Sequence, residues 1–134
     1  MSLLVLDTDA ASALTLGRAP AALAENVAGR VPAITFVTLG ELTTWTLVRR
    51  WGPRRLAAMR RFLAALVVLP YDEAVAHRWG EIQAFARLRG RPRPANDTWI
   101  AACCLTRDVP LATFNLRDFA DFAEHEGLEL LPPG

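Results

Sequence analysis

Four carboxylates stand in similar contexts along this chain, each just after an expected strand or at the start of an expected helix: Asp7, Glu41, Asp97 and Asp118. Carboxylates that are brought together repel one another, and burial adds a desolvation cost, so a fold tolerates such a cluster mainly when a cation binds there. Because the ligands would all be oxygen atoms, with no His or Cys nearby, Mg²⁺ is the expected ion and Mn²⁺ the alternative. Such an ion can lower the pKa of bound water and orient a phosphodiester, which is chemistry that needs no nucleophilic side chain.

Two of these acids also have a structural interpretation at a helix start. Asp97 follows Asn96, which is a good N-cap residue, so the Asp97 carboxylate could simply interact with the helix dipole. Thr38 and Glu41 fit the capping-box pattern, in which a glutamate bonds back to the first residue of its own helix. The residue types alone leave both roles open for both acids.

A structural role explains the other acids to different degrees. Asp118 stands three residues after Asn115, so it too could be an acid in the first turn of a helix. Asp9 is better explained as an N-cap than as a metal ligand. Asp7 comes directly after an apolar run and has no obvious packing role, so a functional role is favoured most strongly at that position.

The elements that would position these acids alternate between strands and helices. Short apolar runs typical of buried parallel strands occupy residues 2–6, 33–37, 66–69, 109–113 and 128–131. Helical stretches separate them, at residues 10–16, 21–28, 38–50, from 53 onward, at 73–88, from 96 onward and at 115–125. Such alternation predicts an α/β fold with a parallel sheet and helices on both faces. Ligands of such sheets bind beyond the carboxyl ends of the strands, so the four acids are expected to converge at that edge.

Length and composition bound the class of protein. The 134 residues are enough to bury a core, so residues 1–134 are expected to form a single domain. The apolar run at residues 3–6 is too short for a signal peptide or a membrane span, and no membrane association is expected. Cys103 and Cys104 are adjacent in an apolar stretch, which argues against a disulfide and favours a cytoplasmic location.

The basic residues point weakly towards nucleic acid. All 15 of them are arginine, with six and no acid between Arg49 and Arg61 and a second group at Arg87, Arg89, Arg91 and Arg93. Arginine suits phosphate recognition, although a solvated helix face explains these groups equally well. Trp99 could stack on a base, but at an apolar helix start it is expected to belong to the core. Asp108 and Asp121 are expected to be ordinary surface acids.

Four segments of the chain resemble one known family. Residues 6–9 (LDTD), 38–42 (TLGEL), 96–102 (NDTWIAA) and 113–119 (TFNLRDF) are similar to motifs of PIN-domain ribonucleases, and most similar to those of VapC-type toxins from toxin–antitoxin pairs. The segments follow the family order, and the resemblance extends over nearly the whole chain. The chain departs from the commonest pattern at Asp9, where asparagine is usual.

The resemblance implies a fold, an activity and partners. The fold would be PIN-like and three-layered, with a central parallel sheet of about five short strands between helices. The activity would be a Mg²⁺-dependent endoribonuclease that hydrolyses RNA, kept inactive by a small VapB-type antitoxin, in a protein that forms a homodimer. Asp7, Glu41 and Asp97 correspond to metal-site acids of the family. The fourth position could be Asn115 or Asp118, of which Asp118 is our choice.

Two other functions fit part of the pattern. Residues 7–9 fit the opening Asp-x-Asp of haloacid-dehalogenase-type phosphatases, and Thr38 could supply their second-strand hydroxyl. That chemistry, like that of a phosphorylatable receiver domain, usually relies on a lysine, and the chain has none. A degenerate PIN domain that only binds RNA or protein is the third interpretation, and the presence of four acids argues against it.

Overall fold

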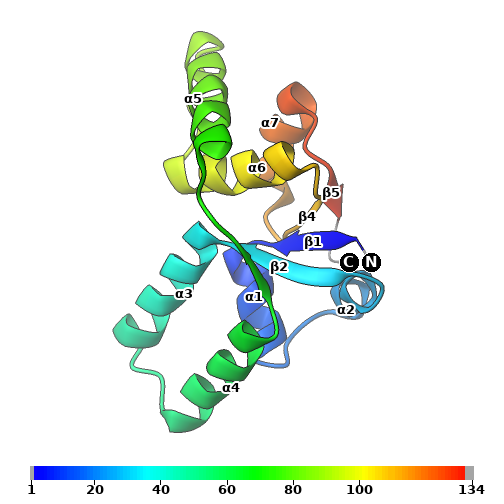
Figure 1. Cartoon of the computed structure of the whole chain (residues 1–134), viewed down its shortest axis with the longest axis vertical. Helices are drawn as coiled ribbons and strands as arrows, with labels where there is room; N and C mark the ends of the chain where they lie inside the picture. The colour runs from blue at the N-terminus through cyan, green and yellow to red at the C-terminus, as the bar shows by residue number, and fades with distance from the viewer. Residues whose placement is uncertain (1, 132–134) are drawn as a thin grey trace.

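A computed structural model describes residues 2–131 (Figure 1). Within that range the strands form one parallel sheet in the order β3-β2-β1-β4-β5. The strands are β1 (Leu3–Leu6), β2 (Val31–Thr35), β3 (Val67–Leu69), β4 (Leu111–Ala112) and β5 (Leu130–Leu131). The helices are α1 (Thr8–Thr15), α2 (Ala21–Ala28), α3 (Phe36–Val48), α4 (Pro53–Ala64), α5 (Glu73–Leu88), α6 (Ala95–Arg107) and α7 (Leu116–Glu126). The predicted α/β class, the parallel sheet and the alternation of elements are confirmed.

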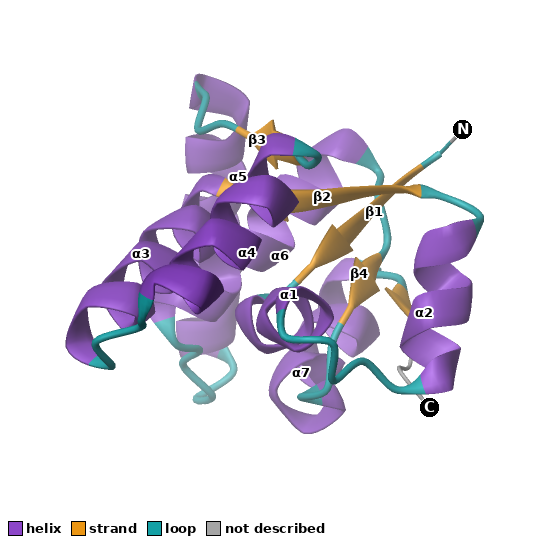
Figure 2. Ribbon diagram, turned by 90° about the horizontal axis from the view of Figure 1, so that it is seen from below, coloured by secondary structure: helices purple, strands orange, loops and turns teal. Residues whose placement is uncertain are grey.

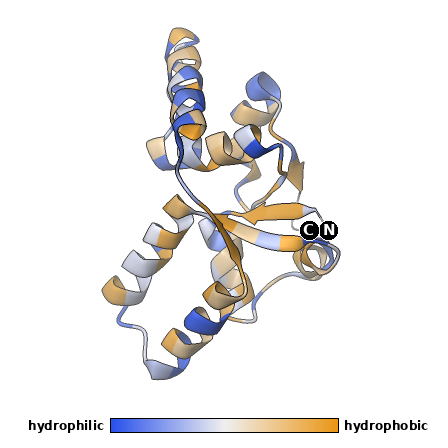
Figure 3. Cartoon of the chain, in the orientation of Figure 1, coloured by the Kyte–Doolittle hydropathy of each residue, from blue (hydrophilic) through white to orange (hydrophobic). Residues whose placement is uncertain are grey.

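The helices cover both faces of the sheet. Successive strand residues point to opposite faces, and apolar residues on both faces need to be buried. Leu4 and Leu6 of β1 are fully buried in a core with α1, α2, α3 and α4, whereas Val5 is buried in a second core with α5, α6 and α7. Figure 2 shows α1, α3 and α4 in front of the sheet and α5 and α6 behind it. β1 is hydrophobic along its length in Figure 3, as expected for a strand that is covered on both faces.

The order of the strands creates a reversal point next to β1. The chain first adds β2 and β3 on one side of β1, then crosses over and adds β4 and β5 on the other side. Parallel pairing aligns Leu6 with Ala112, so β1 and β4 end side by side. In open parallel sheets ligands bind where the strand order reverses, beyond the carboxyl ends of the strands. The segments that directly follow β1 and β4 are therefore the expected position of a site.

Several predicted boundaries differ from the structure by a few residues. The strand predicted at residues 33–37 is β2, which ends at Thr35, and α3 begins at once with Phe36. Asn96 is not the N-cap of its helix, because α6 already begins at Ala95 after Pro94. A proline fixes its own φ near the helical value and leaves no N–H to satisfy, so a start this close to Pro94 costs little.

None of the helices between residues 2 and 131 is both long and apolar enough to cross a membrane.

Candidate metal-binding site

Asp7 lies directly after β1 and is 3% exposed. Its Oδ1 accepts a hydrogen bond from the Ala10 backbone N–H at 2.9 Å, so Asp7 is the N-cap of α1. The prediction that Asp9 is the N-cap was therefore wrong, since α1 begins two residues earlier than expected. The Oδ2 atom of Asp7 accepts a hydrogen bond from the Thr113 hydroxyl, which follows β4. Asp7 thus joins the ends of the two strands that flank the reversal point.

Glu41 does not belong to a capping box. The N-cap of α3 is Thr35, whose Oγ1 accepts from the Thr38 backbone N–H at 3.3 Å, so Thr38 is the third residue of the helix. Glu41 then falls in the second turn, out of reach of the free N–H groups at the helix start. Its Oε1 accepts instead from the Thr8 hydroxyl at 2.7 Å, across to α1. The structure therefore excludes the capping-box role that the sequence left open for Glu41.

Asp97 lies in the first turn of α6 and is half-buried. No side chain caps the start of this helix, because its N-cap residue is Pro94. Free backbone N–H groups at a helix start favour a nearby negative charge, so a dipole interaction is available to Asp97. Asp97 also lines the same pocket as Asp7 and Glu41, so its position satisfies the structural and the metal-binding interpretation together.

The pocket has a volume of about 100 Å³, and four of its nine lining residues are acidic. It brings together α1, α3, α6 and the start of α7, which are far apart in sequence. Its lining residues are Asp7, Thr8, Asp9, Glu41, Trp45, Asp97, Ile100, Asn115 and Phe119. Three of the four predicted site acids therefore meet in one pocket at the carboxyl edge of the sheet, as expected from the strand order.

Two residues, Asn115 and Asp118, are candidates for the fourth position of the metal site. Asn115 lines the pocket and its Nδ2 donates to Asp9 Oδ2 at 2.9 Å, whereas Asp118 is exposed and outside the lining residues. The negative charge of Asp118 nevertheless raises the pKa of Asp97, so the two carboxylates are electrostatic neighbours. Asp118 as a metal ligand stays a prediction.

Burial strongly affects the ionisation of Asp7. Its pKa is raised from 3.8 to about 6. Desolvation is the largest cause, and the charges of Asp9 and Asp97 also raise the pKa. The hydrogen bonds from Thr113 and from the Ala10 N–H oppose this change, because they favour the charged carboxylate. The net result is a carboxyl group that is costly to ionise where it stands.

Asp97 shows the same shift with a larger share from its neighbours. Its pKa is raised from 3.8 to about 6. Burial is the largest cause, the charges of Asp118 and Glu41 raise the pKa further, and the charge of Arg93 lowers it. Like charges therefore contribute directly to the cost of ionising this site. A bound cation would remove the cost, so the donor set of this pocket fits a hard divalent ion.

These pKa values predict how the stability of chelator-treated protein depends on pH. The folded pKa values of Asp7 and Asp97 exceed the unfolded ones, so between about pH 4 and pH 6 the folded state binds more protons than the unfolded chain. The free energy of unfolding from these groups is greatest below about pH 4 and is lost as the pH rises through 6. From pH 4.5 to 7 the loss is on the order of 2 kcal/mol for Asp7 and smaller for the more solvated Asp97.

Denaturant unfolding in chelator at several pH values measures this loss. Wild type and the variants Asp7→Asn and Asp97→Asn are compared, because the effects of all other titrating groups are common to the three proteins. We expect both asparagine variants to lose less stability than wild type between pH 4.5 and 7. Parallel curves for all three proteins would contradict the raised pKa values.

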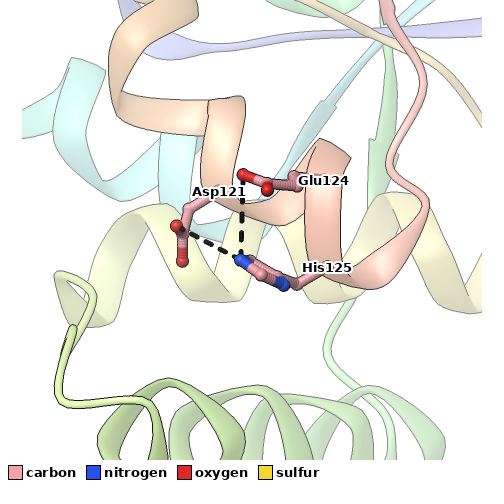
Figure 4. Close-up of side chains that lie close together, drawn as sticks. All are labelled: Asp121, Glu124 and His125. Atoms are coloured by element: carbon pink, nitrogen blue, oxygen red, sulfur yellow. Dashed lines mark ion pairs between the residues drawn. The ribbon is translucent and has the colours of Figure 1, made fainter.

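Within residues 2–131, one set of three ligand atoms lies within 4.8 Å of one another, and it is not the predicted one: Asp121, Glu124 and His125 of α7 (Figure 4). His125 Nε2 is 3.9 Å from Asp121 Oδ1 and 3.8 Å from Glu124 Oε2. The other oxygen of Asp121 is 3.2 Å from Arg89 Nη2 and 4.0 Å from Arg93 Nε. A metal ion at Asp121 would compete with two guanidinium groups, so this set has a structural explanation without an ion.

Asp121 is not the surface acid that the sequence suggested, since it is only 6% exposed. Its ion pairs tie Arg89, at the end of α5, and Arg93, in the loop before α6, to the middle of α7. That loop leads directly into the helix start that carries Asp97. Asp121 therefore helps to hold the loop that precedes Asp97 in place, although Asp121 is not among the residues that line the acidic pocket.

Three further side chains at or beside the pocket were not predicted from the sequence. Thr8 and Thr113 orient Glu41 and Asp7 through their hydroxyl groups, and Trp45 lines the pocket wall. Thr8 lies two residues after the strand expected at residues 2–6, and Thr113 is the last residue of the strand expected at residues 109–113. Their position at the carboxyl ends of these strands is the signal that could have identified them. Trp45 carried no such signal, because it lies in the interior of an apolar helix.

Comparison with known proteins gives consistent matches. The PIN domain family matches residues 4–125. Ribonuclease VapC5 of Mycobacterium tuberculosis is 32% identical over 126 residues, which are 92% of this chain and 87% of the relative. The tRNA(fMet)-specific endonuclease VapC of Shigella flexneri is 35% identical over 86 residues, which are 64% of this chain. That match spans 65% of the relative, just under two thirds of its length.

A solved structure has the same architecture along the whole chain. In the crystal structure of DNA-bound VapBC from Salmonella typhimurium, the similar chain superposes with a TM-score of 0.81 and 26% sequence identity. The superposition covers 100% of each chain. The similarity therefore includes every element that contributes to the acidic pocket.

Proposed function

This chain belongs to the PIN domain family, in its VapC-type group, and we propose that it is a Mg²⁺-dependent endoribonuclease that serves as the toxin of a VapBC-type toxin–antitoxin pair. The observation that carries the activity is the convergence of Asp7, Glu41 and Asp97 on one pocket at the reversal point of the sheet. The sequence relatives named ribonuclease or endonuclease support the same reaction class.

Asp7, Glu41 and Asp97 would hold the metal ion, with Asp118 or Asn115 completing the site. The raised pKa values of Asp7 and Asp97 support this assignment, because burial, and after it the neighbouring negative charges, makes both carboxylates costly to ionise, and a bound divalent cation would offset that cost. When bound, such an ion would lower the pKa of a water molecule and polarise the RNA phosphodiester.

The chain's own contribution is to hold the carboxylates in place. The Ala10 N–H and the Thr113 hydroxyl bind the two oxygens of Asp7 and leave its carboxylate little freedom to rotate. The Thr8 hydroxyl of α1 restrains Glu41 through one of its carboxylate oxygens. Preorganised ligands of this kind reduce the reorganisation that the reaction would otherwise require.

Arginines near the pocket support an RNA substrate. Arg93 is close enough to lower the pKa of Asp97, and Arg91 in the same loop is exposed. A second exposed group lies on α4, at Arg54, Arg55, Arg60 and Arg61. Exposed, positively charged side chains of this kind can neutralise phosphates of an RNA strand.

The expected partner is a small VapB-type antitoxin, and the expected assembly is a homodimer in the cytoplasm. The solved VapBC structure that resembles this chain along its full length supports the antitoxin. A haloacid-dehalogenase-type phosphatase has no support, because the chain contains no lysine and matches a different family.

A comparison of two substrates tests the proposed activity. Purified protein is incubated with labelled total RNA and with para-nitrophenyl phosphate, each with Mg²⁺, with Mn²⁺ and with chelator. We expect RNA fragments with either metal ion, intact RNA in chelator, and no release of nitrophenol. The Asp7→Asn variant, purified in parallel, controls for contaminating nuclease. Release of nitrophenol would instead support a phosphatase, and RNA that is bound but never cut would support a degenerate PIN domain.

A further inference from the structure

A second hollow shares Glu41 with the acidic pocket. Its volume is about 420 Å³, roughly four times that of the acidic pocket, and it is open to solvent. It lies between α3 and the start of α6 and is lined by Phe36, Val37, Gly40, Glu41, Thr44, Asn96 and Trp99. Glu41 lines both spaces, so whatever occupies the hollow is in contact with the site of the proposed reaction.

We propose that this hollow is a nucleobase subsite, which binds one unpaired base of a single-stranded RNA next to the phosphodiester at the acidic pocket. The inference rests on the proposed ribonuclease function and adds to it a class of substrate. Unpaired RNA bases are recognised by aromatic side chains on which they stack and by polar groups that bond their edges. Phe36 and Trp99 supply the first kind of contact, and the exposed amide of Asn96 can both donate and accept.

Ring contacts hold the aromatic side chains of the hollow in place. Trp79 stacks on Trp99 with ring centroids 4.8 Å apart and an angle of 15° between the ring planes. The indole N–H of Trp79 donates to the Ala95 carbonyl oxygen at 3.3 Å, which fixes that ring in turn. Phe36 meets Trp99 edge-on at 5.8 Å. Side chains that are already ordered lose little entropy when a ligand binds, so this wall is prepared for stacking.

Gly40 leaves part of the hollow open. It is exposed in the interior of α3, where glycine is the least favourable residue apart from proline. A Cβ atom at this position would meet nothing within 4 Å, so packing within the chain does not require a glycine. The space that its missing side chain leaves open belongs to the hollow. A larger side chain at position 40 would therefore reduce the space that is available to a ligand in the hollow.

Gly80 offers a matched control elsewhere in the molecule. It is also exposed in a helix interior, in α5, and a Cβ atom there would likewise meet nothing within 4 Å. Gly80 is not among the residues that line the hollow or the acidic pocket. Gly40→Leu and Gly80→Leu should therefore both fold and both raise the melting temperature, because leucine is a much better helix former than glycine.

Binding is measured without cleavage, in protein that also carries Asp7→Asn. Asp7 does not line the hollow, and asparagine is as good an N-cap as aspartate, so the helix start is preserved. The probes are fluorescein-labelled decamers of A, C, G or U and a decamer with the same ribose-phosphate backbone and no bases. Fluorescence anisotropy in Mg²⁺ gives a dissociation constant for each probe with the background protein, with Gly40→Leu added and with Gly80→Leu added.

The expected result is a loss that depends on the presence of bases. Gly40→Leu should weaken binding of at least one of the four decamers by roughly fivefold or more, which corresponds to the lower end of the stacking contribution of one base. It should leave the abasic decamer unchanged, since phosphate contacts lie elsewhere. Gly80→Leu should leave all five dissociation constants unchanged.

Two outcomes would overturn the subsite. Equal weakening of base-containing and abasic decamers would mean that leucine disturbs the acidic pocket and not a base. Unchanged RNA affinity would exclude a base from the hollow, and a change of oligomeric state on sedimentation of Gly40→Leu would then identify it as a contact between copies of the chain. Because binding is scored separately from cleavage, failure of the ribonuclease activity itself would appear only in the two-substrate assay.

Discussion

Glu41→Gln is expected to keep its fold and to lose Mg²⁺-dependent RNA cleavage by at least about a factor of ten, or ~1.4 kcal/mol in the activation barrier. Glutamine retains an oxygen that can accept from the Thr8 hydroxyl, so the link between α1 and α3 should survive. What the substitution removes is the negative charge at the pocket. Since Glu41 lies beyond the first turn of α3, no helix-capping role can account for a loss of activity.

The measurement is the rate of RNA cleavage at saturating Mg²⁺, together with a thermal melt. Glu81→Gln serves as the matched control, because Glu81 is also a glutamate on a helix, exposed on α5 and outside the pocket. The control should cut RNA at the wild-type rate. Full activity of Glu41→Gln would remove Glu41 from the site, whatever its melting temperature.

For Asp97→Asn we expect a stability change whose sign depends on the metal ion. In chelator at neutral pH the variant should be as stable as wild type or more stable, because one of several repelling carboxylates is gone. With Mg²⁺ at a hundredfold excess over its dissociation constant, wild type should gain about 2.7 kcal/mol from binding. Asp97→Asn should gain much less, since it has lost a ligand.

A purely structural role for Asp97 leads to the opposite pattern. Loss of a favourable interaction with the helix dipole would destabilise the variant by roughly 0.3–1 kcal/mol, with or without Mg²⁺. Glu73→Gln provides that reference, because Glu73 is an acid in the first turn of α5 and lies away from the pocket. Thermal melts of the three proteins in chelator and in millimolar Mg²⁺ separate the two roles. A destabilised Asp97→Asn with an undiminished response to Mg²⁺ would exclude Asp97 as a metal ligand.

The interpretation of these variants depends on details that the sequence suggested incorrectly. The capping box at Glu41 was a reasonable inference from its spacing to Thr38, and it fails because β2 ends at Thr35 instead of Val37. The N-cap is Thr35 instead of Thr38, and this shift of three residues moves Glu41 from the first turn of its helix to the second. Boundaries of elements are the least certain part of any inference from periodicity, and capping roles depend entirely on them.

Sequence alone determined the order of strands and helices, the parallel sheet and the edge at which the acids would gather. Continuous apolar runs such as residues 3–6 can be buried on both faces only in a sheet covered by helices, and the intervening stretches have the length and periodicity of helices. Acids that directly follow such runs must then lie near one edge. The family resemblance rested on the same residues in the same order, and the match over residues 4–125 confirmed it.

Only the tertiary structure decided what each polar side chain contacts. Thr113 bonds to Asp7, 106 positions away, because parallel pairing places the ends of β1 and β4 side by side. Asp121 is buried because arginines from two other elements reach it, a fact that its own neighbours in sequence do not indicate. Local patterns record which residues favour a strand, a helix or a turn, whereas contacts between distant segments depend on the register of the sheet and on the packing of the helices against it.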